Sequence, residues 1–253
     1  VYPENYALFE HDAGKALLPH FPSFAQKRIA AYVAKTLRGY LTGVGIVPAQ
    51  YGVQERWTEN MLDVLDRHFA VLPFVFGSKP SVADFGLFGP MYGHLSRDPW
   101  PKRELIAKRP NLKAWVERMN SVKAGGGEFL PGDEIPETLK PVFDAIFGEF
   151  YPMLTGIRDE VQKFLPKMKP GRPRLPRALG EIEFPMGQGR YRRMAMPYTL
   201  WMVQRILERY QAMSLAEREA VDAWTAACGA PEAMRFPLGV RLRRVGLHVT
   251  VDR

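Results

Sequence analysis

The 253-residue sequence contains a single cysteine, Cys228. One thiol cannot form an internal disulfide or supply a four-thiolate zinc site, so both kinds of cross-link are excluded. The histidines show no close pairing at the spacing of metal ligands, and we expect no metal. They are His11, His20, His68, His94 and His248. The sequence also has no long uninterrupted apolar run, which excludes an ordinary transmembrane helix, and we expect no membrane partner.

The N-terminus also lacks the features of a targeting segment. The stretch Val1-Tyr2-Pro3-Glu4 has neither the basic start nor the apolar core of a secretory signal. It begins without an initiator methionine, which indicates a fragment or a processed chain. Together with the lone cysteine, these features favour a reducing, cytoplasmic setting.

Positive charge is abundant but unevenly placed. Residues 1–124 hold 16 Lys+Arg against 11 Asp+Glu, and residues 125–165 hold 3 against 8. Residues 166–253 hold 16 against 8, an excess of +8 that equals the net charge of the whole chain. The basic character therefore belongs to the C-terminal third.

Apolar residues recur mostly at three- and four-residue spacing, which predicts a mainly α fold. Prolines and glycines mark the ends of the helices. The expected helices cover residues 3–18, 24–41, 53–70, 82–95, a segment from Pro110, 138–165 with an interruption at Pro152, 197–213 and 215–228. The proline-rich segment 96–101 is expected to be a turn.

Ser81-Val82-Ala83-Asp84 predicts the start of one of these helices. The Ser81 hydroxyl can accept a hydrogen bond from the backbone N–H of Asp84, and the Asp84 carboxylate can accept one from the N–H of Ser81. Such a capping box stabilises a helix by about 0.5–2 kcal/mol. A second box is predicted at Ser214 and Glu217.

The neighbours of the first box carry a family resemblance. Before it stands Leu72-Pro73-Phe74-Val75-Phe76-Gly77, and after it a helix opens with Pro110-Asn111-Leu112 and continues to Trp115. This order resembles the all-helical C-terminal domain of glutathione S-transferases, most clearly over residues 53–121. The resemblance implies a helical bundle domain over residues 1–124. Residues 125–253 would be an extension with further helices and a short β-hairpin or strand.

The resemblance also implies a function. Family members use glutathione as co-substrate, and the helical domain supplies a wall for a small hydrophobic electrophile and much of a homodimer interface. Glutathione itself is bound mainly by an N-terminal thioredoxin-like domain that carries the catalytic residue. The first fifty residues show helical spacing instead, so we expect an enzyme only if such a domain lies upstream. The alternative is a non-catalytic module for protein interaction.

Four residues are candidates for contact with the substrate. They are Tyr2 and Tyr6 on the first helix, and Tyr92 and Arg97 near the end of the capped helix. A tyrosine at helical spacing can equally be a packing residue. Arg97, with His94 and Asp98 beside it, can bind a carboxylate or simply complement the negative end of the helix dipole.

The extension has two further features. Residues 166–177 contain four prolines, which predicts a linker or an extended strap. Residues 245–251 alternate in polarity as a strand does, and residues 181–184 could pair with them. Three arginine-rich clusters allow non-specific nucleic-acid binding, whereas a basic strap could instead offset the acidic segment 125–165.

Overall fold

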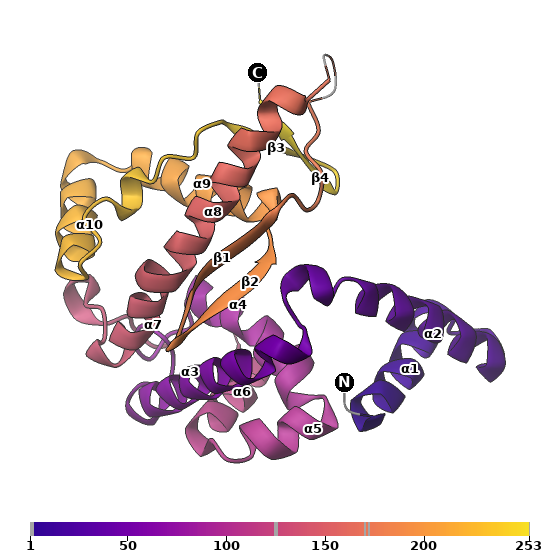
Figure 1. Cartoon of the computed structure of the whole chain (residues 1–253). Helices are drawn as coiled ribbons and strands as arrows, with labels where there is room; N and C mark the ends of the chain where they lie inside the picture. The colour runs from indigo at the N-terminus through magenta and orange to yellow at the C-terminus, as the bar shows by residue number, and fades with distance from the viewer. Residues whose placement is uncertain (1–2, 124–125, 170, 172, 253) are drawn as a thin grey trace. The chain divides into compact units, whose positions relative to one another are not determined.

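The computed structural model describes residues 3–123, 126–169, 171 and 173–252. The chain divides into two compact units (Figure 1). Unit 1 comprises Val1–Tyr40 and Arg56–Pro141, and unit 2 comprises Leu41–Glu55 and Val142–Arg253. None of the helices in the described ranges is both long enough and apolar enough to cross a membrane.

Unit 1 is helical, as predicted. Its main helices are α1 (Pro3–Leu17), α2 (Ser23–Gly39), α3 (Tyr51–Val71, entering from unit 2), α4 (Val82–Pro90) and α6 (Pro110–Ser121). The expected turn at 96–101 is mostly helical instead. A π-helical segment, Met91–Ser96, continues α4, and the short helix α5 (Pro99–Pro101) leads into a second π-helical segment, Lys102–Ile106. Proline fits at the first position of α5, where its missing N–H costs nothing.

The core of unit 1 lies between α3 and α6. Trp115 of α6 is fully buried and stacks on Phe69 of α3, with ring centroids 4.6 Å apart. Leu62 of α3 and Leu112 of α6 are also almost completely buried. The apolar residues at the predicted helical spacing therefore form the faces through which α3 and α6 pack on each other.

Unit 1 extends beyond the boundary expected at residue 124. The backbone N–H of Ser78 donates to the carbonyl of Glu128 at 2.9 Å, and the N–H of Leu130 donates to the carbonyl of Phe76 at 2.9 Å. Further on, Leu139 is buried. The glycine- and acid-rich stretch was expected to separate two domains, but its described residues pair with the loop before α4 and remain part of unit 1.

Unit 2 combines helices with two small hairpins. Its elements are α7 (Lys140–Ala145, beginning in unit 1), a π-helical segment (Ile146–Phe150), α8 (Tyr151–Phe164), β1 (Glu181–Met186), β2 (Gly189–Met194), α9 (Pro197–Gln211), α10 (Leu215–Ala227), β3 (Leu242–Val245) and β4 (His248–Val251). Helix α8 lies along the β1–β2 hairpin (Figure 1). Apolar residues of α8, α9 and both hairpins form one core.

The pairing of the strands differs from the expectation. Residues 245–251 do not form one strand, because Gly246, with a φ of +58°, reverses the chain and β3 pairs with β4. Residues 181–184 pair with β2 and not with this hairpin. The strand β2 was not predicted, because Arg190, Arg192 and Arg193 interrupt the apolar alternation on which strand prediction depends.

The proline-rich segment is extended, as predicted. Its residue Arg174 forms an antiparallel bridge with Thr250, and the N–H of Leu175 donates to the carbonyl of Val249 at 2.9 Å. Among the described residues of unit 2, no acidic side chain forms an ion pair with the basic side chains of this segment. The strap therefore lies against β4, and the expected neutralisation is not seen for the acidic residues that share unit 2 with it.

Residues 41–55 belong to unit 2 because they clamp the edge of β2. The Gln50 side-chain amide donates to the carbonyl of Arg192 at 2.9 Å, and its oxygen accepts from the Arg192 N–H at 2.7 Å. The Tyr191 hydroxyl donates to the carbonyl of Val44 at 3.1 Å. Gln50 thus pairs with the strand edge much as a neighbouring strand would.

Candidate functional site

The predicted capping box at the start of α4 is present and extends into the core. The Asp84 carboxylate is fully buried. Its Oδ2 accepts from the Ser81 N–H and the Ser81 hydroxyl, both at 2.8 Å. Its Oδ1 accepts from the Val75 N–H and from Trp115 Nε1, both at 3.0 Å. One carboxylate therefore fixes the preceding loop, the start of α4 and the core tryptophan of α6.

The start of α6 is held by side chains of α3. The Asp66 carboxylate accepts from the backbone N–H groups of Asn111 and Leu112, at 2.8 and 2.9 Å. These N–H groups have no partner within their own helix, so Asp66 caps α6 from a distance in sequence. The buried Arg109 guanidinium donates to Asp63 at 2.7 Å and to the carbonyl of Leu105 at 2.9 Å.

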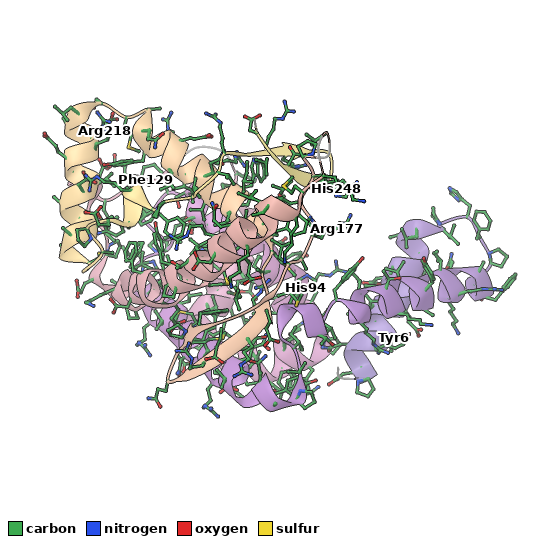
Figure 2. The ribbon with its side chains drawn as sticks, turned by 45° about the horizontal axis from the view of Figure 1, so that its top comes forward. Tyr6, His94, Phe129, Arg177, Arg218 and His248 are labelled. Carbon is green, nitrogen blue, oxygen red and sulfur yellow. The ribbon has the colours of Figure 1, made fainter. Side chains whose placement is uncertain are left out.

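The structure does not gather the predicted substrate residues into one cluster. Tyr2 lies outside the described residues. The Arg38 guanidinium lies over the ring of Tyr6, 4.4 Å from its centroid, and a hydrogen bond to Glu10 raises the pKa of Tyr6. Figure 2 shows Tyr6 on the first helix. In the described part of the chain, no hydrogen bond, ion pair or ring contact joins Tyr6, Tyr92 and Arg97 to one another.

Arg97 holds two segments of unit 1 together. It pairs with Asp12 of α1 at 2.8 Å, and not with the adjacent Asp98. Its position just after the Met91–Ser96 segment also agrees with a cation at the C-terminal end of a helix. Both charges are largely exposed, so this pair contributes little to stability.

Tyr92 borders a hollow of about 220 Å³ in unit 1. Its ring stacks on Phe88, with centroids 5.1 Å apart. The remaining walls mix apolar and polar side chains, namely Ser96, Lys102, Ile106, Ala107, Lys113, Val116, Glu117 and Asn120. The Ser96 hydroxyl is buried and has no hydrogen-bond partner within the described ranges. The hollow can therefore take a small molecule that offers an apolar body and one hydrogen-bonding group.

The segment that makes these contacts matches a known protein family. Residues 58–118 match the family model of the glutathione S-transferase C-terminal domain. They form a glutathione S-transferase C-terminal-like domain. The match includes both ends of the Asp66–Asn111 and Asp84–Trp115 contacts. No curated protein and no solved structure matches the chain.

A buried histidine accompanies the capping box of this transferase-like domain. His68 of α3 is completely buried, and its Nδ1 lies 2.7 Å from the Thr138 hydroxyl. Its Nε2 has no hydrogen-bond partner among the residues described. Burial lowers the pKa of His68, while the backbone of Phe74 and then the Asp84 carboxylate act in the opposite direction. The ring therefore packs as a neutral core residue, a role that the sequence did not reveal.

We expect this histidine to make unit 1 sensitive to acid. Above pH about 6.5 the ring is neutral in both the folded and the unfolded state. Below that pH the unfolded chain binds a proton that the folded chain does not bind, so stability falls by up to about 1.4 kcal/mol per pH unit. The loss continues until the lowered pKa of the folded state is reached. Denaturant unfolding at several pH values from 7 to 5 measures this slope.

His68→Gln is expected to flatten that slope. His20→Gln, at an exposed position of unit 1, is the control for replacing a histidine with glutamine. Equal slopes in the parent chain and in His68→Gln would contradict a buried neutral imidazole.

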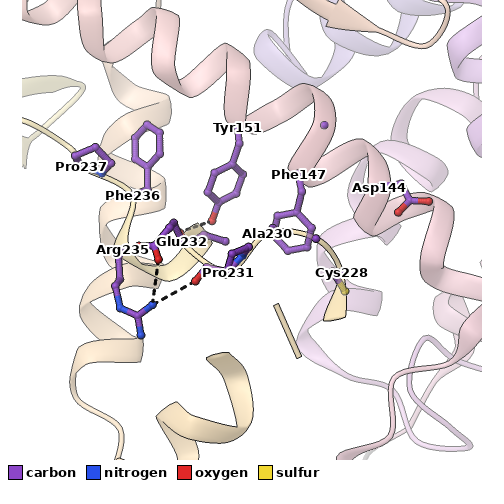
Figure 3. Close-up of a pocket in the computed structure, with 13 residues that line it drawn as sticks. Asp144, Phe147, Tyr151, Cys228, Ala230, Pro231, Glu232, Arg235, Phe236 and Pro237 are labelled. Carbon is purple, nitrogen blue, oxygen red and sulfur yellow. Dashed lines mark hydrogen bonds and ion pairs between the residues drawn. The ribbon is translucent and has the colours of Figure 1, made fainter. Parts of the chain in front are cut away.

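Unit 2 contains a separate, larger pocket of about 840 Å³ (Figure 3). Its walls include three aromatic rings, those of Phe147, Tyr151 and Phe236, together with Cys228. The Tyr151 hydroxyl donates to the carbonyl of Ala233 at 3.0 Å, and burial raises its pKa. The sequence did not predict this pocket, because its walls come from the segment before α8, the first residue of α8 and the loop after α10.

The basic clusters of the extension are partly neutralised. Both Arg190 and Arg192 pair with Glu183. Arg177 lies beside His248 (Figure 2). Burial, followed by the charges of Arg174 and Arg177, lowers the pKa of His248. Within the described ranges, no three histidine, cysteine or acidic side chains are placed to hold a metal ion.

Proposed function

We propose that unit 1 forms the wall for the electrophilic substrate of a glutathione transferase. The match over residues 58–118 is the observation that supports this role most strongly. The buried contacts of Asp84 would hold α4 and α6 in a fixed relation, so that the wall keeps its shape.

The hollow beside Tyr92 supports the choice of substrate class. Ile106 and Val116 provide apolar surface, and Ser96 and Lys102 provide polar groups. A small hydrophobic electrophile with a nitro or carbonyl substituent suits this combination, since the substituent can accept a hydrogen bond. Tyr6 and Arg97 remain proposed contacts, and each is already held in place by a charged neighbour.

We further propose that a thioredoxin-like domain outside this chain supplies the activated thiol of glutathione. Within the described ranges, every strand belongs to one of two antiparallel hairpins. In the reaction, the glutathione thiolate attacks the electrophile, and a hydrogen bond to sulfur lowers the pKa of the thiol. Glutathione is thus a co-substrate, and the single cysteine agrees with a reducing, cytoplasmic setting.

A homodimer is the proposed assembly. The α1–α2 pair and its connection expose several large apolar side chains, namely Leu17, Phe21, Phe24, Tyr32 and Leu37. Phe24 is 74% exposed and Tyr32 68% exposed. A second copy of the chain would cover this apolar surface.

Conjugation of a chlorodinitrobenzene with glutathione tests the proposed function. We expect a longer polypeptide that includes an upstream thioredoxin-like domain to catalyse the reaction, and this chain alone to give only the rate in buffer. Tyr92→Ala in the longer polypeptide should raise KM for the electrophile several-fold. Activity of the chain alone would place a thiol site within it. An inactive longer polypeptide would favour the alternative, a non-catalytic interaction module.

A further inference from the structure

The outward face of α9 is unusual for a surface helix because it combines large apolar side chains with arginines. Its one acidic residue, the half-exposed Glu208, lies at the border of this face and pairs with Arg241 at 3.1 Å. Six of the exposed or half-exposed residues of this face follow helical spacing, namely Tyr198, Trp201, Met202, Arg205, Ile206 and Arg209. Ile206 is 58% exposed, and Tyr198 and Met202 are also exposed. A helix that buries one face in the core normally shows polar residues on the other.

The tip of the β3–β4 hairpin extends this surface. Leu247 is 76% exposed and Val245 is 50% exposed. The Arg244 guanidinium lies 5.6 Å from the centroid of the Trp201 ring, and its Nε donates to the carbonyl of Gly246 at 2.9 Å. The hairpin tip therefore lies beside the apolar face of α9. We call the six α9 residues together with Arg244, Val245 and Leu247 the α9 patch.

The charge of the α9 patch is positive. Arg205 and Arg244 have no carboxylate within ion-pair distance among the described residues. By contrast, Arg241 and Arg243, in the same hairpin and the residues leading into it, have Glu208 or Asp252 as partners. Arg205 and Arg244 therefore remain available to an external anion.

We propose that the α9 patch binds the surface of an anionic lipid bilayer. Leu247, Ile206 and Met202 would enter the boundary between headgroups and acyl chains, while the arginines contact lipid phosphates. Tryptophan and tyrosine at the edge of such a patch suit the same boundary. The apolar side chains come from two separated elements, so no apolar run in the sequence marks them, and we expected no membrane partner on that ground.

The same observations favour a bilayer over a nucleic acid. Single-stranded nucleic acid stacks its bases on open aromatic faces. The Trp201 ring already has the Arg205 and Arg244 cations against it, at 5.3 and 5.6 Å. The most exposed patch residues, Leu247 and Ile206, are aliphatic and offer no face on which a base can stack. This proposal is independent of the proposed transferase role, because it depends on unit 2 alone.

Co-sedimentation of the full chain with lipid vesicles tests the proposal. One vesicle preparation is phosphatidylcholine alone, and the other is a 1:1 mixture of phosphatidylcholine and the anionic lipid phosphatidylglycerol. We expect binding to the anionic vesicles that weakens with added salt, and at least tenfold weaker binding to the neutral vesicles. Arg205→Gln and Arg244→Gln should each weaken anionic binding about fivefold. Leu247→Ser should weaken it about three- to tenfold.

Two matched variants serve as controls. Val82→Ser removes a side chain that is 89% exposed in unit 1, and Lys163→Gln removes an exposed cation of α8. Both should bind as the parent chain does, and circular dichroism verifies that every variant is folded. Three results would overturn the proposal: equal binding to both vesicles, no binding to either, or patch variants that bind like the controls. Preferential binding of a single-stranded oligonucleotide, or self-association abolished by Leu247→Ser, would also overturn it and identify a different occupant.

Discussion

Asp84→Ala is expected to destabilise unit 1 by about 3–5 kcal/mol. The substitution leaves the N–H groups of Val75, Ser81 and Trp115 without their acceptor. An unsatisfied buried donor costs about 1–3 kcal/mol, and Trp115 is completely buried. The expected loss exceeds the 0.5–2 kcal/mol of an ordinary cap because two of these donors lie outside the capping box. Amide hydrogen exchange of residues 110–121 in denaturant measures this loss of stability.

The chain provides a matched control for this prediction. Ser214 and Glu217 form the same capping box at the start of α10, but Glu217 is exposed and, within the described ranges, accepts no hydrogen bond from a core side chain. Glu217→Ala should therefore cost only about 1 kcal/mol. Trp115→Phe retains the stacking on Phe69 and removes the indole donor, so the double variant with Asp84→Ala should lose less than the sum of the single variants. Equal losses for Asp84→Ala and Glu217→Ala would contradict the central role of Asp84.

Gly45→Ala is expected to destabilise unit 2 by about 3 kcal/mol. Gly45 has a φ of +85°, which alone costs an alanine about 1–2 kcal/mol. A Cβ atom there would also clash with the Arg192 carbonyl and lie 2.6 Å from the Tyr191 ring, which adds about 1–3 kcal/mol. The clash would displace the loop whose Val44 carbonyl accepts from the Tyr191 hydroxyl. Hydrogen exchange over β1 and β2 reports the loss.

Gly246→Ala separates the two contributions. Gly246 also has a positive φ, +58°, but an added Cβ atom would meet nothing within 4 Å. We therefore expect a loss of about 1 kcal/mol from the backbone alone. If Gly45→Ala were no more harmful than Gly246→Ala, residues 41–55 would not be packed on β2 as described.

Much of the helical fold could be predicted from the sequence, because the signals that start, continue and end a helix lie close together in the chain. The bounds of α1 and α3 and the start of α6 follow from apolar spacing and from the prolines beside them. The capping box at Ser81 was also predicted, since its two hydrogen bonds span only three residues. The partners of Asp84 Oδ1 could not be predicted, because Trp115 lies 31 residues further along the chain and only the tertiary fold brings it near.

Other features depend on contacts between distant segments. The limit of unit 1 at Pro141 depends on backbone hydrogen bonds from the loop before α4 to Glu128 and Leu130, which composition does not encode. The clamp of Gln50 on Arg192 spans 142 residues and has no sequence pattern. The hollow at Tyr92 combines side chains from separate segments of unit 1, so only Tyr92 itself was predicted there.

The central claim is that unit 1 is the substrate wall of a transferase and does not contain its thiol site. Calorimetric titration of the purified chain tests this claim most directly. A chlorodinitrobenzene analogue without the leaving group and glutathione are titrated separately into the parent chain and into Tyr92→Ala. We predict saturable binding of the aromatic compound, weakened several-fold in Tyr92→Ala, and no saturable binding of glutathione. Saturable binding of glutathione, or aromatic binding that Tyr92→Ala leaves unchanged, would contradict the account.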